Sequence, residues 1–454
     1  MLDLAQAFFD LLPNFSPEMI GVLMIAAMLF AIFVGFPISF TLIFLGVFFG
    51  AWGFGIKLTI FLMNLQIYGS MMEQTLAAVP LFVFMGFMME QAGLMERLFS
   101  AVQLMLARMR GSLFIAVLFV SVIFGAATGI VGASVTILGI MAATTMNRSG
   151  YDVRLAAGTI TAGGTLGILI PPSIMLVVMG PVLEIPVTDL FAAAILPGIM
   201  MAALYLIYAV GRCWLNPELG PALPEHMIPD DRSHVYREFF LGLVPPAVLI
   251  AFAMGSILAG WATPTEGAGM GAFGSVLLCL AYGKLSWATT YSALRKTLEI
   301  SVLILFLVAA SNFFGAVFSR LGTPQMLTDI MLTLDLSAGW IVIMILALVF
   351  ILGWPLEWVP IVLIILPILY PVLQALDVDM LWFAILVAVC LQTAWLSPPV
   401  ALSAYFLKGV VPEWDLKDIY FGMMQFMVIQ LIGLAIVFFV PSIATWLPRY
   451  LYGN

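Results

Sequence analysis

The stretch TAGGTLGILIPPSIMLVVMG, residues 161–180, decides the fold, because it is apolar enough to cross a membrane yet carries Pro171 and Pro172 near its middle. A proline lacks the N–H donor and its ring clashes with the preceding turn, so a helix must break here. Inside a bilayer, such a break is tolerated only where the freed backbone groups face protein, water or an ion. The break therefore predicts a buried polar site.

The same interruption occurs in LQTAWLSPPVALSAYFL, residues 391–407, which carries Pro398 and Pro399. The second pair of prolines follows the first by 227 residues, half of the 454-residue chain. Two broken helices at matching places in two halves are typical of transporters built from inverted repeats, in which the binding site lies at the repeat interface.

The composition identifies a membrane protein. Hydrophobic residues make up 64% of the chain and charged residues 9%, with a mean hydropathy of +1.17, which excludes an ordinary soluble domain. The three cysteines are scattered singly, and no P-loop, HExxH, GxSxG or dinucleotide-binding signature stands in a suitable context. We therefore expect no enzyme activity, no catalytic residue and no cofactor, so that energy for transport must come from an ion gradient.

Each half of the chain has the pattern of five membrane crossings and one re-entrant hairpin, so we expect an all-α polytopic membrane protein with broken helices at the midplane. The predicted parts are a first repeat at residues 1–211 (scaffold 18–110, hairpin and broken helix 111–182), a polar cytoplasmic linker at 212–237, and a second repeat at 238–454 (scaffold and arm 239–338, hairpin and broken helix 339–407).

The distribution of basic residues predicts the orientation. Five crossings are an odd number, so the second half is inverted relative to the first. With the N-terminus on the outer side of the membrane, only Lys57, Arg320 and Arg449 of the 16 basic residues lie outside, which satisfies the positive-inside rule. The two hairpins then enter from opposite sides, and their tips should meet the two proline breaks near the midplane.

No Lys, Arg or His falls in a predicted membrane core. Lys284, Arg295 and Lys296 are expected in a short basic connector before the crossing at residues 297–318, where Glu299 is close enough to Lys296 to pair with it. We therefore expect a bound anion to be held by half-helix N-termini, hydroxyls and backbone N–H groups, or by charge brought in with an ion.

Two clusters of small and hydroxyl residues are candidates for binding Na⁺ or substrate, because exposed carbonyls and neutral hydroxyl oxygens suit a hard monovalent cation. The alternative for any single glycine is close helix packing. The first cluster, at hairpin tip and break, comprises Thr128, Gly129, Gly132, Ser134, Gly163, Gly164, Gly167, Pro171, Pro172 and Ser173. The second comprises Gly353, Pro355, Glu357, Thr393, Ser397, Pro398 and Pro399.

Glu266 in GWATPTEGAGMG is a weaker candidate for binding Na⁺. It is an acid in apolar surroundings, where ionisation needs a compensating partner or ion. Because it is only a few residues from the predicted outer surface, capping or hydrogen bonding within its own helix is at least as good an interpretation.

Four stretches of the chain contain most of these candidate residues: FGAATGIVGASVTILG, ITAGGTLGILIPPSI, GWATPTEGAGMGAFG and LQTAWLSPPVALSAYFLKGV. In these stretches the chain resembles the large membrane subunit of the tripartite ATP-independent periplasmic (TRAP) transporters. The resemblance implies Na⁺-driven uptake of an organic acid across the bacterial inner membrane by an elevator motion. It also implies a small four-helix membrane partner and a periplasmic substrate-binding protein. Where many relatives have Gly, this chain has Ala401.

Two other hypotheses stay open. A stand-alone divalent-anion/Na⁺ symporter shares the paired hairpins and breaks, and it would need neither a small membrane subunit nor a binding protein. A structural or receptor-like membrane protein would show no gradient-dependent uptake at all.

Overall fold

The computed structural model describes residues 12–222, 232–334, 336–398 and 400–453, together with residues 6, 8 and 9, and every regular element within them is a helix. This confirms the predicted all-α class. The elements of the first half are α2 (Pro17–Val34), α3 (Ile38–Phe54), α4 (Ile56–Met72), η1 (Gln74–Ala77), α5 (Ala78–Gln91), α6 (Leu94–Met105), α7 (Ser112–Thr128), α8 (Val131–Arg148), α9 (Val153–Thr165), η2 (Leu166–Ile168), α10 (Ile174–Leu183), α11 (Val187–Leu215) and η3 (Pro217–Leu219).

The second half begins with α12 and ends with a short helix, α22, that the sequence did not predict as a separate element. Its elements are α12 (Arg232–Leu258), α13 (Pro264–Ala281), α14 (Trp287–Arg320), α15 (Thr323–Leu332), α16 (Ala338–Leu352), α17 (Trp358–Pro360), the π-helical η5 (Ile361–Ile365), α18 (Leu366–Ala375), α19 (Met380–Gln392), η6 (Thr393–Trp395), α20 (Leu402–Val410), α21 (Leu416–Phe439) and α22 (Ser442–Tyr452).

The helices of the two halves correspond at a separation of 227 residues, the spacing between Thr165 and Gln392. Both α9 and α19 precede a break, and they begin and end at corresponding positions, as do the 3₁₀ turns η2 and η6 that follow them. Both predicted breaks are therefore present, and they occur at the same place in each repeat.

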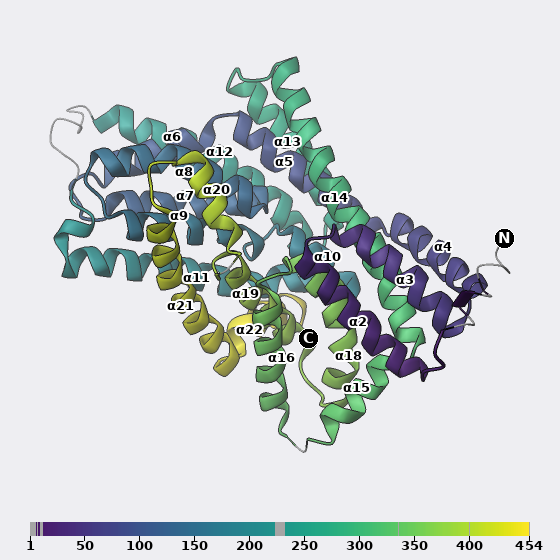
Figure 1. The fold of residues 1–454 in the computed structure, drawn as a ribbon. Helices are drawn as coiled ribbons and strands as arrows, with labels where there is room; N and C mark the ends of the chain where they lie inside the picture. Colours follow the sequence, from purple (N-terminus) through teal and green to yellow (C-terminus); the bar gives the residue numbers. More distant parts are fainter. Residues whose placement is uncertain are drawn as a thin grey trace.

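The two hairpins are also present. In the first, α7 and α8 are joined at Gly129 and Ile130; in the second, residues 353–357 join α16 to the helical run Trp358–Ala375. In Figure 1, α7 and α8 approach the middle of the molecule from the upper left, whereas α16 and α18 approach it from the lower edge. The hairpins thus converge from different sides.

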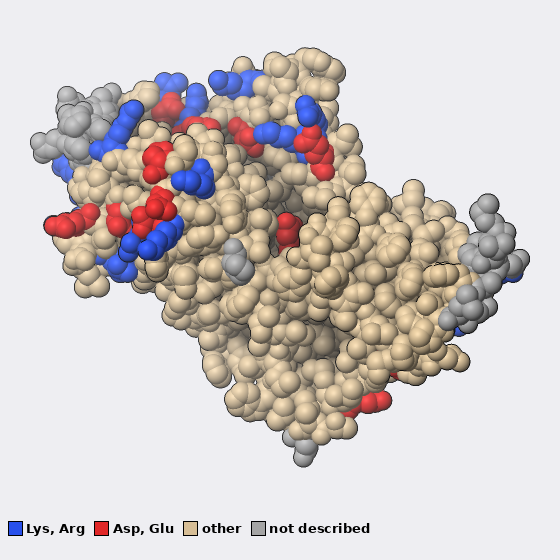
Figure 2. All heavy atoms as spheres, in the orientation of Figure 1, with Lys and Arg blue, Asp and Glu red and all other residues tan. Residues whose placement is uncertain are grey.

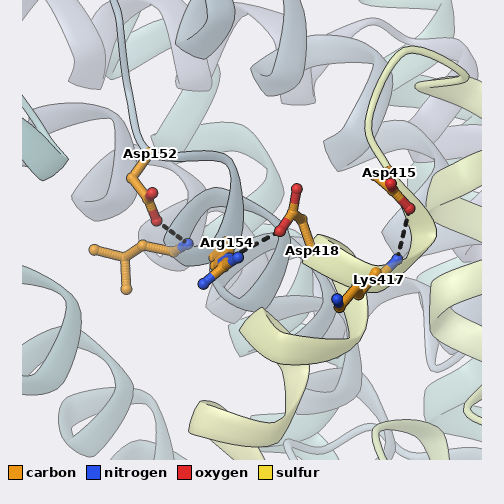
Figure 3. Close-up of polar contacts among 6 residues, drawn as sticks. Asp152, Arg154, Asp415, Lys417 and Asp418 are labelled. Carbon is orange, nitrogen blue, oxygen red and sulfur yellow. Dashed lines mark hydrogen bonds and ion pairs between the residues drawn. The ribbon is translucent and has the colours of Figure 1, made fainter.

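Charged side chains fix the beginning of each broken helix. Asp152 caps α9 by accepting a hydrogen bond from the backbone N–H of Leu155, and Asp379 caps α19 at the corresponding position. Figure 3 shows that α9 is also tied to α21 by an ion pair between Arg154 and Asp418, with Nε and Oδ1 2.8 Å apart. Asp415 caps α21 in turn by accepting from the backbone N–H of Lys417.

Six of the described helices are long and apolar enough to cross a membrane, or seven if α4 and the segment Gln74–Gln91, bent by 55° relative to it, form one span. The sequence predicted ten crossings, five in each half. The two broken helices are not among the six because each consists of two short segments, α9 with α10 and α19 with α20, and α3, with 17 residues, is also too short to be counted. One of the six, Trp358–Ala375, belongs to the predicted second hairpin.

One predicted boundary was wrong. The basic connector expected before residue 297 is not a separate segment, because α14 runs unbroken for 34 residues and includes Arg295 and Lys296. Since the sequence has neither Gly nor Pro from Trp287 to Phe314, nothing interrupts the helix there. Residues 223–231 of the predicted linker lie outside the described residues.

Candidate functional site

A cavity of about 670 Å³, the central cavity, lies where the hairpins and breaks meet. Its lining includes residues 129–133 at the first hairpin tip, Ile168 and Ile174 at the first break, residues 357–359 at the second tip, and Trp395 at the second break. The lining also includes residues 37–40, Glu90 of α5, one face of α14, residues 136 and 137 of α8, and Phe406 of α20. Figure 2 shows the surface hollowed near its middle, with an acidic group in the hollow.

The first hairpin packs on the first break through glycines. A side chain on Gly167 would place its Cβ 2.7 Å from the carbonyl oxygen of Gly125, and one on Gly164 would overlap Val135. Gly163 lies in the same way against Ser121. Gly164 and Gly167 thus bring backbone against backbone, which is the close packing given above as the alternative for single glycines. Their binding of an ion or substrate stays a prediction.

The predicted site residues fall into two groups. Gly129, Gly132 and Glu357 line the central cavity. The others are buried or half-buried beside it: Ser134, Gly163, Gly164, Gly167, Pro171, Pro172, Ser173, Gly353, Pro355, Thr393, Ser397 and Pro398. The side chain of Thr128 and the whole of Pro399 lie outside the described part of the chain.

The hydroxyl groups beside the breaks donate to backbone carbonyls. Ser173 Oγ donates to the carbonyl of Ile168, and Ser397 Oγ donates to that of Thr393 at 2.7 Å. Thr393 Oγ1 donates to the carbonyl of Cys390 at 2.6 Å. Because a hydroxyl that donates its proton keeps its lone pairs, these oxygens are still able to bind a cation.

Three helices begin at the cavity without a side-chain cap. They are α8, α10 and the run that starts at Trp358, and their first residues line the cavity. The first N–H groups of a helix have no intrahelical acceptor and carry a partial positive charge, so such ends attract anions. This is the arrangement that the sequence predicted for holding an anionic substrate.

The position predicted for Lys296 was wrong. Its Nζ lies 3.1 Å from Oε1 of Glu90 and 5.2 Å from the ring centroid of Phe87, on the wall of the central cavity. Glu299, its expected partner, pairs instead with Arg295 at 2.9 Å on an exposed face. The expectation that an anion would meet no basic side chain does not hold for this cavity.

A signal for Lys296 was present in the sequence. Lys296, Ile300, Leu303 and Leu307 follow one another at spacings of three and four residues, and all line the cavity. The uninterrupted helical pattern of α14 would have placed Lys296 on this face. Its partner Glu90 lies 206 residues away, and no local pattern indicates the pairing.

Glu266 lies away from the cavity and forms a capping box. Its Oε2 accepts from both the backbone N–H and the hydroxyl of Thr263, while Thr263 Oγ1 accepts from the N–H of Glu266. The geometry favours the capping interpretation over ion binding.

Ala401 adopts the left-handed backbone conformation at the start of α20, with φ 39° and ψ 62°. A residue with a Cβ is strained there, whereas Gly is not, which explains why Gly suits this position.

Replacing Ala401 by Gly should therefore stabilise the protein by about 0.5–1 kcal/mol, or leave its stability unchanged if the added freedom of the unfolded chain offsets the gain. Thermal unfolding of the purified protein measures this, with Ala404→Gly within α20 as the control, which should destabilise. A clear loss of stability for Ala401→Gly would contradict the strain.

Comparison with known proteins agrees with this architecture. Residues 23–443 match the family model described as the tripartite ATP-independent periplasmic transporter, DctM component. The C4-dicarboxylate TRAP transporter large permease protein DctM of Pseudomonas aeruginosa is 28% identical over 390 residues, which cover 85% of this chain and 89% of that protein. The sialic acid TRAP transporter large permease protein SiaM of Vibrio cholerae is 28% identical over 429 residues, covering 93% and 97%.

Two further matches are more distant or partial. The isethionate TRAP transporter permease protein DctMQ of Oleidesulfovibrio alaskensis is 27% identical over 369 residues, covering 81% of this chain and 57% of that protein. The crystal structure of the YdaH transporter of Alcanivorax borkumensis has a similar fold, with a TM-score of 0.61, 15% identity, and coverage of 87% of this chain and 90% of that one.

Proposed function

Since this chain belongs to the DctM component family of the tripartite ATP-independent periplasmic transporters, we propose that it is a large permease subunit that couples Na⁺ entry to the import of a small organic acid. Relatives are named for transport of C4-dicarboxylates, sialic acid and isethionate, all of which are organic anions. The substrate class proposed for this chain is therefore an acid that is ionised at neutral pH.

The charge of the central cavity is the observation that carries this proposal. Lys296 and Glu90 neutralise each other, and Glu357 adds a carboxylate with no ion-pair partner among the described residues. An anion that enters a cavity of net negative charge is repelled unless a cation enters with it. Cotransport of a cation is the direct solution to this repulsion.

The residues divide into an anion side and a cation side. Lys296 and the uncapped N-termini of α8 and α10 would hold the substrate carboxylate. Glu357, together with the carbonyl and hydroxyl oxygens of the two predicted clusters, would hold Na⁺. Glu90 would serve as the counter-ion of Lys296 while the cavity holds no substrate.

The motion, the partners and the orientation are part of the same proposal. The hairpins and broken helices would move together against the remaining helices as an elevator. A small four-helix membrane subunit would support the scaffold, and a periplasmic binding protein would deliver the substrate. The N-terminus would lie in the periplasm, with the protein in the bacterial inner membrane. On the face shown in Figure 2, basic and acidic groups gather together toward one end, which would be the cytoplasmic end.

Liposomes that contain the chain with its small membrane subunit, supplied with the cognate binding protein, should accumulate substrate above equilibrium when an inward Na⁺ gradient is imposed. The binding protein's ligand, identified by a thermal-shift screen of organic acids, is the substrate to use. A pH gradient alone should drive no accumulation. Uptake without any gradient dependence would contradict the proposal, and uptake without the binding protein or the small subunit would favour the stand-alone symporter.

In the same assay, Glu357→Gln should raise the Na⁺ concentration for half-maximal uptake about tenfold or more, because an interaction with a charged group contributes about 1.5–3 kcal/mol and about 1.4 kcal/mol is a tenfold change in affinity. Glu299→Gln removes a carboxylate that is exposed and away from the cavity, so it should leave the Na⁺ dependence unchanged. Identical Na⁺ dependence in both variants would exclude Glu357 from the cation site.

A further inference from the structure

The two repeats contact each other through corresponding residues at the ends of the broken helices. Thr165 is the last residue of α9 and Gln392 is the last residue of α19, and the Nε2 of Gln392 donates to the carbonyl oxygen of Thr165 at 3.1 Å. Because corresponding residues meet, this contact lies where the axis relating the repeats must pass. Two helix C-termini, each with a partial negative charge, converge there.

Two more polar side chains reach the same point. Gln430 of α21 donates from Nε2 to Thr165 Oγ1 at 3.2 Å. The hydroxyl of Tyr205 of α11 lies near the side chains of Thr165 and Gln430, but its distance and angle to them do not meet the criteria for a hydrogen bond. All four side chains have 0% of their surface exposed, and none of them lines the central cavity.

The hydrogen bonding of this group is incomplete. Gln392 Oε1, Gln430 Oε1 and Tyr205 Oη are buried without a hydrogen-bond partner among the described residues. Leaving even one polar oxygen unpaired in the interior is costly, so three beside one threonine indicate a missing ligand.

The geometry fits a cation. A glutamine amide that rotates by half a turn exchanges its NH₂ and its oxygen, which would bring both Oε1 atoms to the positions that lie 3.1 and 3.2 Å from the Thr165 oxygens. Oxygens at this separation repel each other unless a cation lies between them. An ion that binds oxygens at about 2.3–2.6 Å, as Ca²⁺ does and as Na⁺ of nearly the same radius does, has its ligands at such spacings.

We propose that Thr165, Gln392, Gln430 and Tyr205 form a buried Na⁺ site at the junction of the two repeats, separate from the two clusters beside the hairpins. Its ligands are the carbonyl and hydroxyl oxygens of Thr165, both glutamine amide oxygens and the tyrosine hydroxyl. The set is neutral, so it suits a monovalent rather than a divalent cation. An ion there ties α9 to α19, and thereby joins the two broken helices into one unit.

Direct binding to the purified membrane complex tests the site, with radioactive Na⁺ as the only added ligand and choline as the balancing cation. No substrate is present, so the result does not depend on whether Na⁺ drives transport. Gln392→Met and Gln430→Met keep the side-chain length but remove the amide oxygen. Each should bind one Na⁺ fewer per chain than the parent protein, or bind that ion at least tenfold more weakly.

A matched control is Gln425→Met on α21, because Gln425 accepts from Tyr208 outside the group. It should bind as many Na⁺ ions as the parent protein. Unchanged Na⁺ binding in Gln392→Met and Gln430→Met would overturn the site and leave a buried water as the occupant. Equal competition by K⁺ would overturn the assignment to Na⁺.

Gln392→Glu keeps the proposal testable if the methionine variants do not fold. A carboxylate supplies the same oxygen and adds a negative charge, so the melting temperature of Gln392→Glu should depend on Na⁺ concentration more steeply than that of the parent protein. A melting temperature that does not respond to Na⁺ more than the parent's would count against the site.

Discussion

Replacing Lys296 by Gln should lower the rate of uptake at limiting substrate concentration by roughly 10- to 100-fold, because a hydrogen bond to a charged group contributes about 1.5–3 kcal/mol. Lys296 is the basic side chain among the described residues that line the central cavity, and the uncapped ends of α8 and α10 line the same cavity. The substitution also leaves Glu90, whose Oε2 is already buried without a partner, as an uncompensated charge. Initial uptake into proteoliposomes, with the binding protein in excess, measures the effect.

Arg295 offers a matched control one residue away. It pairs with Glu299 on an exposed face of the same helix, so Arg295→Gln should change uptake less than twofold. Lys296→Arg keeps the charge and should retain more activity than Lys296→Gln. If Lys296→Gln transported as well as Arg295→Gln, Lys296 would have no part in binding the substrate.

Replacing Gly422 by Ala should destabilise the protein by about 3 kcal/mol or more, because an added Cβ would overlap the carbonyl oxygen of Arg154. The neighbouring contact is equally close, since a Cβ on Gly158 would lie 2.6 Å from the carbonyl oxygen of Gly422. Backbone atoms in a helix cannot move aside as a flexible side chain can. α21 would have to separate from α9, which would also strain the Arg154–Asp418 ion pair. The melting temperature and the yield of monodisperse protein in detergent should both fall.

Gly315→Ala is the matched control for this change, because no atom lies within 4 Å of a Cβ at that position in α14. It should leave stability unchanged or raise it by up to about 1 kcal/mol through the higher helix propensity of Ala. Equal stability of the two variants would show that α9 and α21 tolerate a wider separation than the structure has.

Most of the fold could be predicted from the sequence, because its determinants are local. A double proline interrupts a helix whatever its surroundings, and the recurrence of the pair at a constant separation indicates two copies of one unit. The hairpins followed from runs too long for one crossing with small residues in their middle. The prediction of helix ends failed at α14, which includes Arg295 and Lys296 although these were expected in a separate connector. Where a helix begins and ends depends on capping and packing as well as on propensity.

The candidate site could be predicted only in part. Glycines and hydroxyls next to the breaks were identifiable because their residue types suit exposed carbonyls and ion ligands, and Gly129, Gly132 and Glu357 do line the cavity. The pairing of Lys296 with Glu90 was missed, as was the group around Thr165. Each joins residues more than 200 positions apart in the sequence.

The sequence by itself thus determined that this chain is a helical membrane protein with two matching breaks, because proline chemistry and apolar composition act on each segment separately. Only the tertiary structure decided which charges face the central cavity and which polar side chains meet at the junction of the repeats. The physical reason is that a side chain's electrostatic partner is set by how distant helices pack, and that packing is a property of the whole chain.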